Sequence, residues 1–331
     1  MFLYAGIDEA GYGPLFGPLV VARTVWGLER TADAAQVPDL WRILSKAVCR
    51  DVKTARRGRV AVNDSKKLHT SGSGVRHLER GVLSCAALAG KHPATVCDWL
   101  DDLGEQAHRD LSGLPWYAPA EDRPWQALPS ALTDGEVAVA RGMVAAAAVE
   151  AGVSVLDFGA AVVFEDRFNR MVSATRSKAA MSFTFVAGHL MSIWQRFGHD
   201  APLVIVDRQS GRRHYRELLA MNFPEARLTI EHESESSSAY RLEASHPRRR
   251  AMTIRFEVDA EPRHLPAALA SMISKYTREL LMARFQSWFT QRAPLVKPTA
   301  GYATDARRFW NQIQPTLTEL SIPPHQLRRI S

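Results

Sequence analysis

The pattern of apolar and polar positions along the chain predicts strands that alternate with long helices. Apolar runs typical of strands cover residues 2–7, 19–26 and 203–206, and the last run resembles a strand buried on both faces. Residues 170–197 and 266–290 instead carry apolar side chains at spacings of three and four, which indicates helices with one buried face. This alternation indicates an α/β fold.

Weaker patterns fill the remaining chain. We expect short helical and strand segments at 59–63 (strand), 96–103 (helix), 136–151 (helix), 160–164 (strand), 227–232 (strand) and 252–258 (strand). From about residue 91 to residue 133, scattered prolines and three tryptophans interrupt any long period. We interpret this stretch as an insertion packed on the main body, with the tryptophans forming a small core of its own.

Composition places the chain among folded, soluble proteins. Of its 331 residues 46% are hydrophobic and 23% charged, which is ordinary globular usage. No apolar run approaches the roughly 20 residues of a membrane span, and the N-terminal segment carries Asp8 and Glu9 where a signal peptide is apolar. The three cysteines form no CxxC pair. We therefore expect a cytoplasmic location and no membrane partner.

The net charge of +7 is unevenly distributed. Arg208, Arg212, Arg213 and Arg216 lie within nine residues, and residues 248–250 are three consecutive arginines. Such clusters suit a polyanion such as nucleic acid, because each phosphate contact releases a condensed counterion. From charge alone, solubilising surface arginines are the better interpretation, and nucleic-acid binding is the alternative.

Two predicted strands are followed directly by carboxylates. Asp8 and Glu9 come after the run 2–7, and Asp207 comes after the run 203–206. Side chains at the ends of strands in an open α/β sheet project into the crevice where ligands bind. Converging carboxylates without cysteine or histidine favour a hard divalent ion, Mg²⁺ or Mn²⁺. From spacing alone, metal binding and simple capping of the following turns are equally good interpretations.

A dinucleotide-binding turn is excluded. Gly11, Gly13 and Gly17 follow a strand, but their spacing is wrong, and Pro14 and Pro18 prevent the helix that receives a pyrophosphate. The sequence also has no GxxxxGK[ST], HExxH or GxSxG motif.

Six segments, in the right order, resemble motifs of the type 2 ribonucleases H, the ribonuclease HII family. The opening segment GIDEAGYGPLFGP is similar to the family's G-x-D-E-A-G-R-G-P-x-x-G-P. The others are NDSKKL (63–68), Asn169 with Ala174 and Ala180-Met181, LVIVD (203–207), ASMISKYTRE (270–279) and GYAT (301–304). Together they span residues 6–304, and the opening motif is the most specific.

The resemblance implies a ribonuclease H-like fold, in which helices flank a mixed central sheet, with a C-terminal helical part. We expect one such domain over 1–331, enlarged by the insertion at about 91–133 and by a β-hairpin region at about 227–258. The implied activity is that of a metal-dependent endonuclease. Such an enzyme hydrolyses the phosphodiester 5′ of ribonucleotides in RNA–DNA hybrids or in DNA duplexes with embedded ribonucleotides, and leaves 5′-phosphomonoesters.

The resemblance also implies site residues. Asp8, Glu9 and Asp207 become ligands of two Mg²⁺ or Mn²⁺ ions, and counting back ten residues from the serine of the ASMIS segment gives Glu261 as the fourth carboxylate. Asp259 is the alternative, and Glu233 or Glu235 a further one. Substrate contacts fall on Gly11, Tyr12, Gly13, Lys66, Lys67 and Tyr302.

Two departures from the family pattern concern substrate recognition. Tyr12 replaces the arginine between the two glycines, and Arg208 replaces the glycine after the third aspartate. These departures keep two alternatives open: a non-catalytic nucleic-acid-binding protein on the same fold, and a structure- or DNA-specific nuclease of the superfamily.

Overall fold

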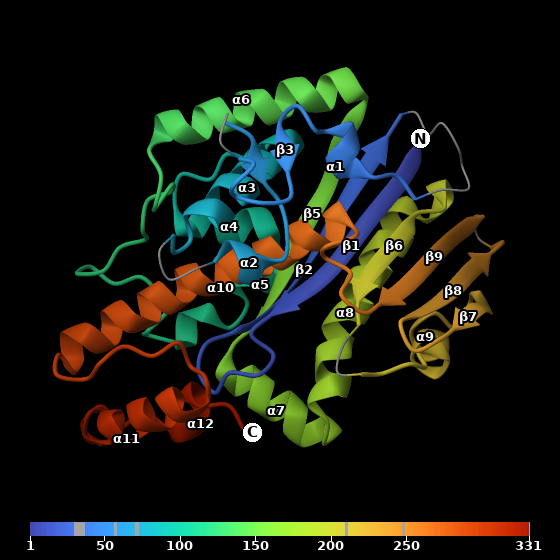
Figure 1. Ribbon diagram of the computed structural model, residues 1–331. Helices are drawn as coiled ribbons and strands as arrows, with labels where there is room; N and C mark the ends of the chain where they lie inside the picture. The colour runs from blue at the N-terminus through green and yellow to red at the C-terminus, as the bar shows by residue number, and fades with distance from the viewer. Residues whose placement is uncertain (30–36, 56–57, 70–72, 209–210, 247–248, 331) are drawn as a thin grey trace.

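The protein is built around a seven-stranded mixed sheet. The computed structural model describes residues 1–29, 37–55, 58–69, 73–208, 211–246 and 249–330. The strand order is β5-β2-β1-β6-β9-β8-β7; β1, β6 and β9 are parallel, and the remaining neighbours are antiparallel (Figure 1). The strands are β1 (Phe2–Ala10), β2 (Leu19–Leu28), β5 (Val153–Val163), β6 (Leu203–Asp207), β7 (Arg227–Glu233), β8 (Ser237–Ala244) and β9 (Arg250–Glu257), and a separate pair is formed by β3 (Val48–Cys49) and β4 (Val60–Ala61).

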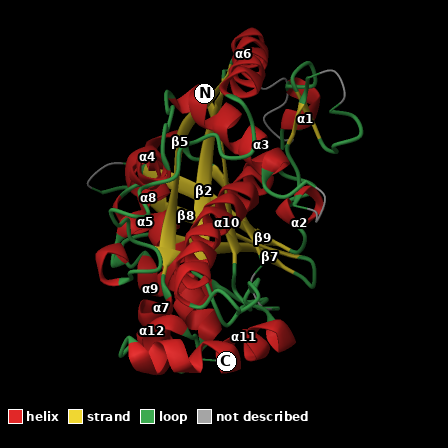
Figure 2. Ribbon diagram, turned by 90° about the vertical axis from the view of Figure 1, so that its left-hand side faces the viewer, coloured by secondary structure: helices red, strands yellow, loops and turns green. Residues whose placement is uncertain are grey.

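Helices cover both faces of the sheet, and each face has its own apolar core. The long helix α10 (Leu265–Arg292) runs along β1 and β2 on one face (Figure 2). Helix α8 (Lys178–Phe197) packs on the other face, where it buries the alternate side chains of the same strands. The remaining helices are α1 (Leu40–Ile43), α2 (Ser65–Leu68), α3 (Arg76–Ala86), α4 (Val96–Leu103), α5 (Glu105–His108), α6 (Asp134–Ala151), α7 (Glu165–Thr175), α9 (Arg216–Asn222), α11 (Ala303–Glu319) and α12 (Pro324–Leu327). No helix in these described ranges is both long and apolar enough to cross a membrane.

The predicted α/β class is confirmed: helices flank a mixed central sheet, with helices at the C-terminal end. The helix expected at 96–103 has these same bounds, and those expected at 136–151 and 266–290 are extended by a few residues at one or both ends. A third strand, β8, which the pattern did not predict, lies between the two strands expected in the 227–258 region.

The predicted continuous helix over 170–197 is wrong. It is two helices, α7 and α8, separated at Arg176, whose φ of 52° is left-handed and ends α7. The Ser177 hydroxyl then accepts a hydrogen bond from the amide of Ala180 (3.2 Å) and caps α8. The apolar residues at spacings of three and four, from Phe183 to Phe197, all lie in α8, so the pattern gave no sign of the break.

Two of the three tryptophans of the 91–133 stretch are buried and Trp125 is half-buried, but they do not form a separate core. The indole N–H of Trp99 donates to the Thr277 hydroxyl of α10 (3.0 Å), and the Trp116 ring lies edge-on to Trp288 with centroids 6.0 Å apart. Both indoles are fully buried in the core between the sheet and α10. This stretch is therefore part of the main packing of the protein.

The first turn of α10 lies directly against β1. A Cβ atom added to Gly6 would be 2.2 Å from the backbone nitrogen of Ala267, so only glycine permits this approach. Farther along α10, the Ser274 hydroxyl donates to the backbone carbonyl of Asp8 (3.1 Å). This close packing fixes α10 against the acidic end of β1.

Candidate functional site

Acidic side chains from three places in the chain meet near the ends of β1 and β6. The two strands are parallel neighbours with Ile7 opposite Val206, so Asp8 and Asp207 occupy the next positions of the same register. Strand β1 is longer than predicted: Asp8 and Glu9 lie within it, paired with β2, rather than after it. Glu261 comes from the segment between β9 and α10.

Asp8 is the most buried member of this group. Its side chain is 4% exposed, and its Oδ2 atom is buried without a hydrogen-bond partner. Burial raises the pKa of Asp8 well above its ordinary value, and the charges of Asp207, Glu261 and Glu9 raise it further. Only the hydrogen bond from Ser271 opposes these effects. The four carboxylates therefore repel one another in an environment that is largely shielded from water.

Asp207 and Glu261 share this environment. Burial and the nearby Glu261 charge raise the pKa of Asp207 to about 7, although its Oδ1 accepts the amide N–H of Ala260 (2.9 Å). Burial likewise raises the pKa of Glu261, together with the charge of Asp64. The Ser271 hydroxyl donates a hydrogen bond to Glu261 Oε1 (3.4 Å). Glu261 is the residue that the count of ten back from Ser271 indicates.

The donor set suits a hard divalent cation. All four side chains offer carboxylate oxygens, their mutual repulsion is relieved by a cation, and Asp8 Oδ2 has no other buried partner. Among the described residues, no three His, Cys, Asp or Glu side chains are already close enough together to hold a metal ion. The residues present therefore fit such an ion chemically, and their side chains would have to move closer together to hold one.

The alternative acidic residues face elsewhere. Asp259 is exposed and has a left-handed φ of 52°, and its charge raises the pKa of Asp207 less than the charge of Glu261 does. Glu233 accepts a hydrogen bond from the Tyr240 hydroxyl and pairs with His214 (2.7 Å), whereas exposed Glu235 pairs with Arg213 (3.2 Å). Neither glutamate is among the main causes of the raised pKa of Asp8 or Asp207.

The two neighbouring lysines of helix α2 have different surroundings. Partial burial lowers the pKa of Lys66, but the negative charges of Asp64, Glu261, Asp8 and Asp207 outweigh it, and the pKa is raised. The Lys66 ammonium group therefore lies within the field of the carboxylates. Lys67 instead lines a surface hollow with Arg50 and Lys53. Asp64 caps α2 by accepting the amide N–H of Lys66 (2.9 Å).

The loop between β1 and β2 is held by two buried arginines. Gly11 has a φ of 85°, and a Cβ there would lie 2.6 Å from the carbonyl of Pro18, so the turn requires glycine. Arg278 of α10 donates to the carbonyls of Pro18 (2.7 Å) and Phe16 (2.9 Å). Arg329, the residue before the last described position, donates to the carbonyls of Gly11 (2.5 Å) and Gly17. The loop backbone is thus fixed from both sides.

A buried glutamate completes this arrangement. Glu165, fully buried at the start of α7, accepts the amide N–H of Gly17 (2.7 Å) and the hydroxyl of Tyr117 (2.8 Å). Burial raises the pKa of Glu165, and the charge of Arg329 lowers it. Sequence reasoning missed Glu165 and Arg329, because neither belongs to a recognised motif and their contacts join positions about 150 and 310 residues apart.

Asn169 anchors the C-terminal segment. Its side-chain amide donates to the carbonyls of His325 and Arg328, both at 2.8 Å, and its Oδ1 accepts the amide of Ile330 (2.8 Å). Asn169 had been noted only as part of a motif. The structure gives it a physical role, since it places Arg329 under the loop.

Three further predicted contacts surround this loop. Gly301 accepts the amide of Leu15 (2.7 Å), and neighbouring Tyr302 is 47% exposed at the start of α11, with the Arg278 guanidinium 6.0 Å from its ring centroid. Tyr12 is half-buried and packs against the core on the α8 face, whereas Gly13 is exposed. The structure therefore brings the GYAT segment beside the opening motif.

The predicted arginine cluster is partly structural. Arg208 donates to the Ser238 hydroxyl (2.9 Å) and to the backbone carbonyls of Ser234 and Glu235 (3.2 and 2.5 Å). It therefore ties the end of β6 to the turn between β7 and β8. Of the arginines at 248–250, Arg248 lies outside the described residues.

Comparison with known proteins gives a distant structural similarity. The sequence matches no family profile and no curated protein. Among solved structures, the chain is similar to RNase HII of Archaeoglobus fulgidus in its complex with PCNA (TM-score 0.40, 14% identity, 99% of this chain and 94% of that chain). It is also similar to Bst-RNase HIII in complex with Mn²⁺ (0.41, 15%, 99% and 66%) and to ribonuclease H2 from Pyrococcus horikoshii OT3 (0.37, 15%, 98% and 92%).

Proposed function

We propose that the protein is a metal-dependent endonuclease that hydrolyses the phosphodiester 5′ of ribonucleotides in RNA–DNA hybrids or in DNA duplexes with embedded ribonucleotides. One observation carries this proposal. At the adjacent ends of parallel β1 and β6, the negative charges of neighbouring carboxylates, Glu9 and Glu261 among them, raise the pKa of Asp8 and of Asp207. A stable protein gains nothing from such repulsion, so the arrangement is best explained by a bound cation.

Asp8, Glu9, Asp207 and Glu261 would hold Mg²⁺ or Mn²⁺. When bound, such ions lower the pKa of water and stabilise the charge on the oxygens of a phosphodiester. Glu261 is preferred to Asp259 as the fourth carboxylate because it raises the pKa of both aspartates, whereas Asp259 is exposed.

The remaining residues would bind and orient the substrate. The Gly11–Gly13 backbone, fixed by Arg278 and Arg329, would present its polar groups to the 2′-hydroxyl that distinguishes RNA from DNA. The exposed ring of Tyr302, beside the same loop, would stack on the sugar next to it. Lys66 would contact a phosphate close to the carboxylates.

The test is a gel cleavage assay with purified protein and Mg²⁺ or Mn²⁺. It compares an all-DNA duplex, a duplex with one embedded ribonucleotide and an RNA–DNA hybrid. We expect cleavage only where a ribonucleotide is present, with 5′-phosphate and 3′-hydroxyl products. Equal cutting of the all-DNA duplex would favour a DNA-specific nuclease, and salt-sensitive binding without cleavage would favour a nucleic-acid-binding protein.

Lys66→Ala should impair this activity far more than Lys67→Ala does. The ammonium group of Lys66 lies in the field of the carboxylates, whereas that of Lys67 faces a separate hollow. Loss of one charge-assisted phosphate contact should raise KM about tenfold and reduce the salt dependence of binding by about one counterion. Steady-state cleavage and binding at several salt concentrations measure both quantities. Equal effects of the two substitutions would contradict this placement of Lys66.

A further inference from the structure

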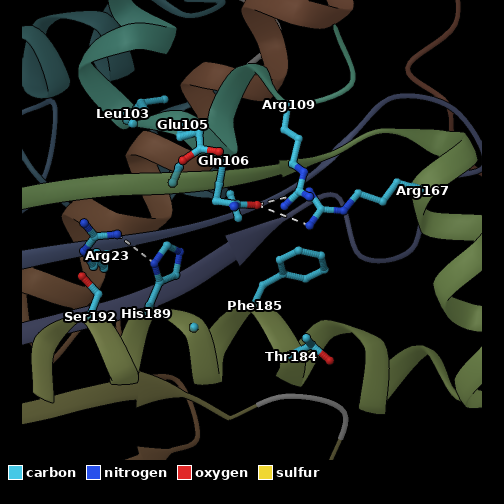
Figure 3. A pocket seen from close by; sticks show the side chains of 14 residues that line it. Arg23, Leu103, Glu105, Gln106, Arg109, Arg167, Thr184, Phe185, His189 and Ser192 are labelled. Atoms are coloured by element: carbon cyan, nitrogen blue, oxygen red, sulfur yellow. Dashed lines mark hydrogen bonds between the residues drawn. The ribbon is translucent and has the colours of Figure 1, made fainter. Parts of the chain in front are cut away.

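One cavity lined by described residues lies away from the carboxylates. It has a volume of about 440 Å³, within the range of small-molecule sites, and lies between β5, α8 and the α4–α5 part of the 91–133 stretch (Figure 3). Arg23, which lines it, is paired with Ile7 across β1 and β2, and Ile7 belongs to the core on the α8 face. Asp8 instead contacts Ser271 of α10. The cavity and the carboxylates are therefore on opposite faces of the sheet.

Two arginines meet at one end of this cavity without an acidic partner. Figure 3 shows Arg109, which follows α5, and Arg167 of α7 pointing toward one another, with the side chain of Gln106 beside them. Both terminal nitrogens of Arg167 donate to Gln106 Oε1 (3.3 Å each), and no ion pair of Arg109 or Arg167 occurs in the described part of the chain. Burial lowers the pKa of Arg167, and the charge of Arg109 lowers it further, although Asp110 acts in the opposite direction.

The floor of the cavity adds a third guanidinium group. Arg23 pairs with Asp157 (2.7 Å), but Arg196 binds the same carboxylate (2.6 Å), so two positive charges share one negative charge. His189 is neutral, because burial lowers its pKa to about 3; its Nε2–H donates to the Val21 carbonyl (2.8 Å), and its Nδ1 accepts from Arg23 (3.0 Å). The arginine is therefore held rigidly at the floor.

The remaining lining is apolar or carries neutral hydrogen-bonding groups. Phe185 and Leu103 supply apolar surface, Ser192 and Thr184 supply hydroxyl groups, and Glu105 is the one acidic residue among the described lining residues. A cationic end joined to an apolar wall with a few polar groups suits a ligand that carries an oxyanion at one end of an organic ring.

We propose that this cavity binds a small organic phosphate of about mononucleotide size, with its phosphate on Arg109 and Arg167 and its organic part against Phe185 and Leu103. The 91–133 stretch then has a function of its own, since it supplies Arg109 and Leu103. This proposal is independent of the proposed nuclease activity, because it shares no residue with the carboxylate group.

Isothermal titration calorimetry on the full chain tests the proposal. The probes are 5′-AMP, ribose 5-phosphate, inorganic phosphate and adenosine. We expect at least one of the two organic phosphates to bind at least about tenfold more tightly than inorganic phosphate or adenosine. No binding of either organic phosphate, or binding by less than this margin, would overturn the proposal.

Variants then locate the ligand. Arg109→Gln and Arg167→Gln should each weaken binding at least about tenfold. Gly188→Leu should abolish binding by filling the cavity, because a Cβ on Gly188 meets nothing within 4 Å and the helix tolerates leucine. Arg170→Gln is the matched control: Arg170 is on α7 but does not line the cavity. Binding should also persist in Asp8→Asn, and unchanged binding in Gly188→Leu would refute this location.

Discussion

Asp8→Asn should abolish cleavage and at the same time make the metal-free protein more stable. The substitution removes a carboxylate whose Oδ2 is buried without a hydrogen-bond partner. The negative charges of Asp207, Glu261 and Glu9 also repel this carboxylate when it is ionised. Loss of a metal ligand should lower kcat at least about a thousandfold. Relief of the repulsion should raise the free energy of unfolding by about 1–3 kcal/mol near neutral pH. Cleavage kinetics and denaturant unfolding without divalent ions measure the two effects.

The gain in unfolding free energy from removing a buried carboxylate should increase with pH, and Asp207→Asn is the variant that tests this. The pKa of Asp207 is raised to about 7 in the folded protein, against 3.8 for an unburied aspartate. The folded state therefore binds the proton more tightly, so this contribution to stability is complete below about pH 4 and is lost as the pH rises through about 7. The advantage of the asparagine variant over the wild type should grow across that interval, with both proteins free of metal.

Divalent ions should reverse the comparison. Mg²⁺ or Mn²⁺ should raise the melting temperature of the wild-type protein and have little effect on that of Asp8→Asn, because only the native carboxylates bind the ion.

Two further variants identify the fourth carboxylate. Glu261→Gln should lose cleavage as Asp8→Asn does, whereas the cleavage rate of Asp259→Asn should stay within about threefold of that of the wild type. Asparagine tolerates the left-handed φ of position 259, so that control should fold. Full activity of Asp8→Asn would refute the assignment.

The carboxylate group could be anticipated because strand ends are visible in the sequence. An apolar run followed by an acidic residue places Asp207 at the end of a buried strand without knowledge of the fold, and β1 and β6 then align it with Asp8. Glu261 needed a motif count from Ser271, and its position between β9 and α10 has no periodic pattern of its own. What the sequence could not supply is the side-chain packing that leaves Asp8 Oδ2 without a partner.

Features that depend on distant contacts were not predictable in this way. The break between α7 and α8 depends on one left-handed residue, Arg176, and apolar periodicity does not report it. Strand β8 was missed because its first residues, Ser237 and Ser238, are polar, although the latter is fully buried and binds Arg208. The cavity lined by Arg109 and Arg167 joins α5 to α7, and no local pattern connects those helices.

The second large prediction concerns the buried arginine near the C-terminus. Arg329→Ala should destabilise the protein and impair cleavage, although it changes none of the four proposed metal ligands. Arg329 is 2% exposed, its guanidinium group lies 4.5 Å from the Phe168 ring centroid, and it donates to the carbonyls of Gly11 and Gly17. Its loss leaves those carbonyls and the buried Glu165 carboxylate without their cation. Removal of one partner from such a buried group should cost about 3–5 kcal/mol of unfolding free energy.

Cleavage by Arg329→Ala should fall about a hundredfold even at temperatures where the variant is fully folded, because a loop displaced by about 1 Å no longer positions the substrate. Arg328→Ala is the matched control: Arg328 is adjacent and only half-buried, and its guanidinium group lies over Trp310, away from the loop. Arg329→Lys separates charge from shape, since lysine keeps the positive charge near Glu165 but cannot bind two carbonyls in the fixed geometry of a guanidinium group. If the loop needs only the charge, the lysine variant should cleave like the wild type. If it needs both guanidinium hydrogen bonds, as the contacts to Gly11 and Gly17 indicate, Arg329→Lys should regain more of the wild-type stability than of the wild-type cleavage rate.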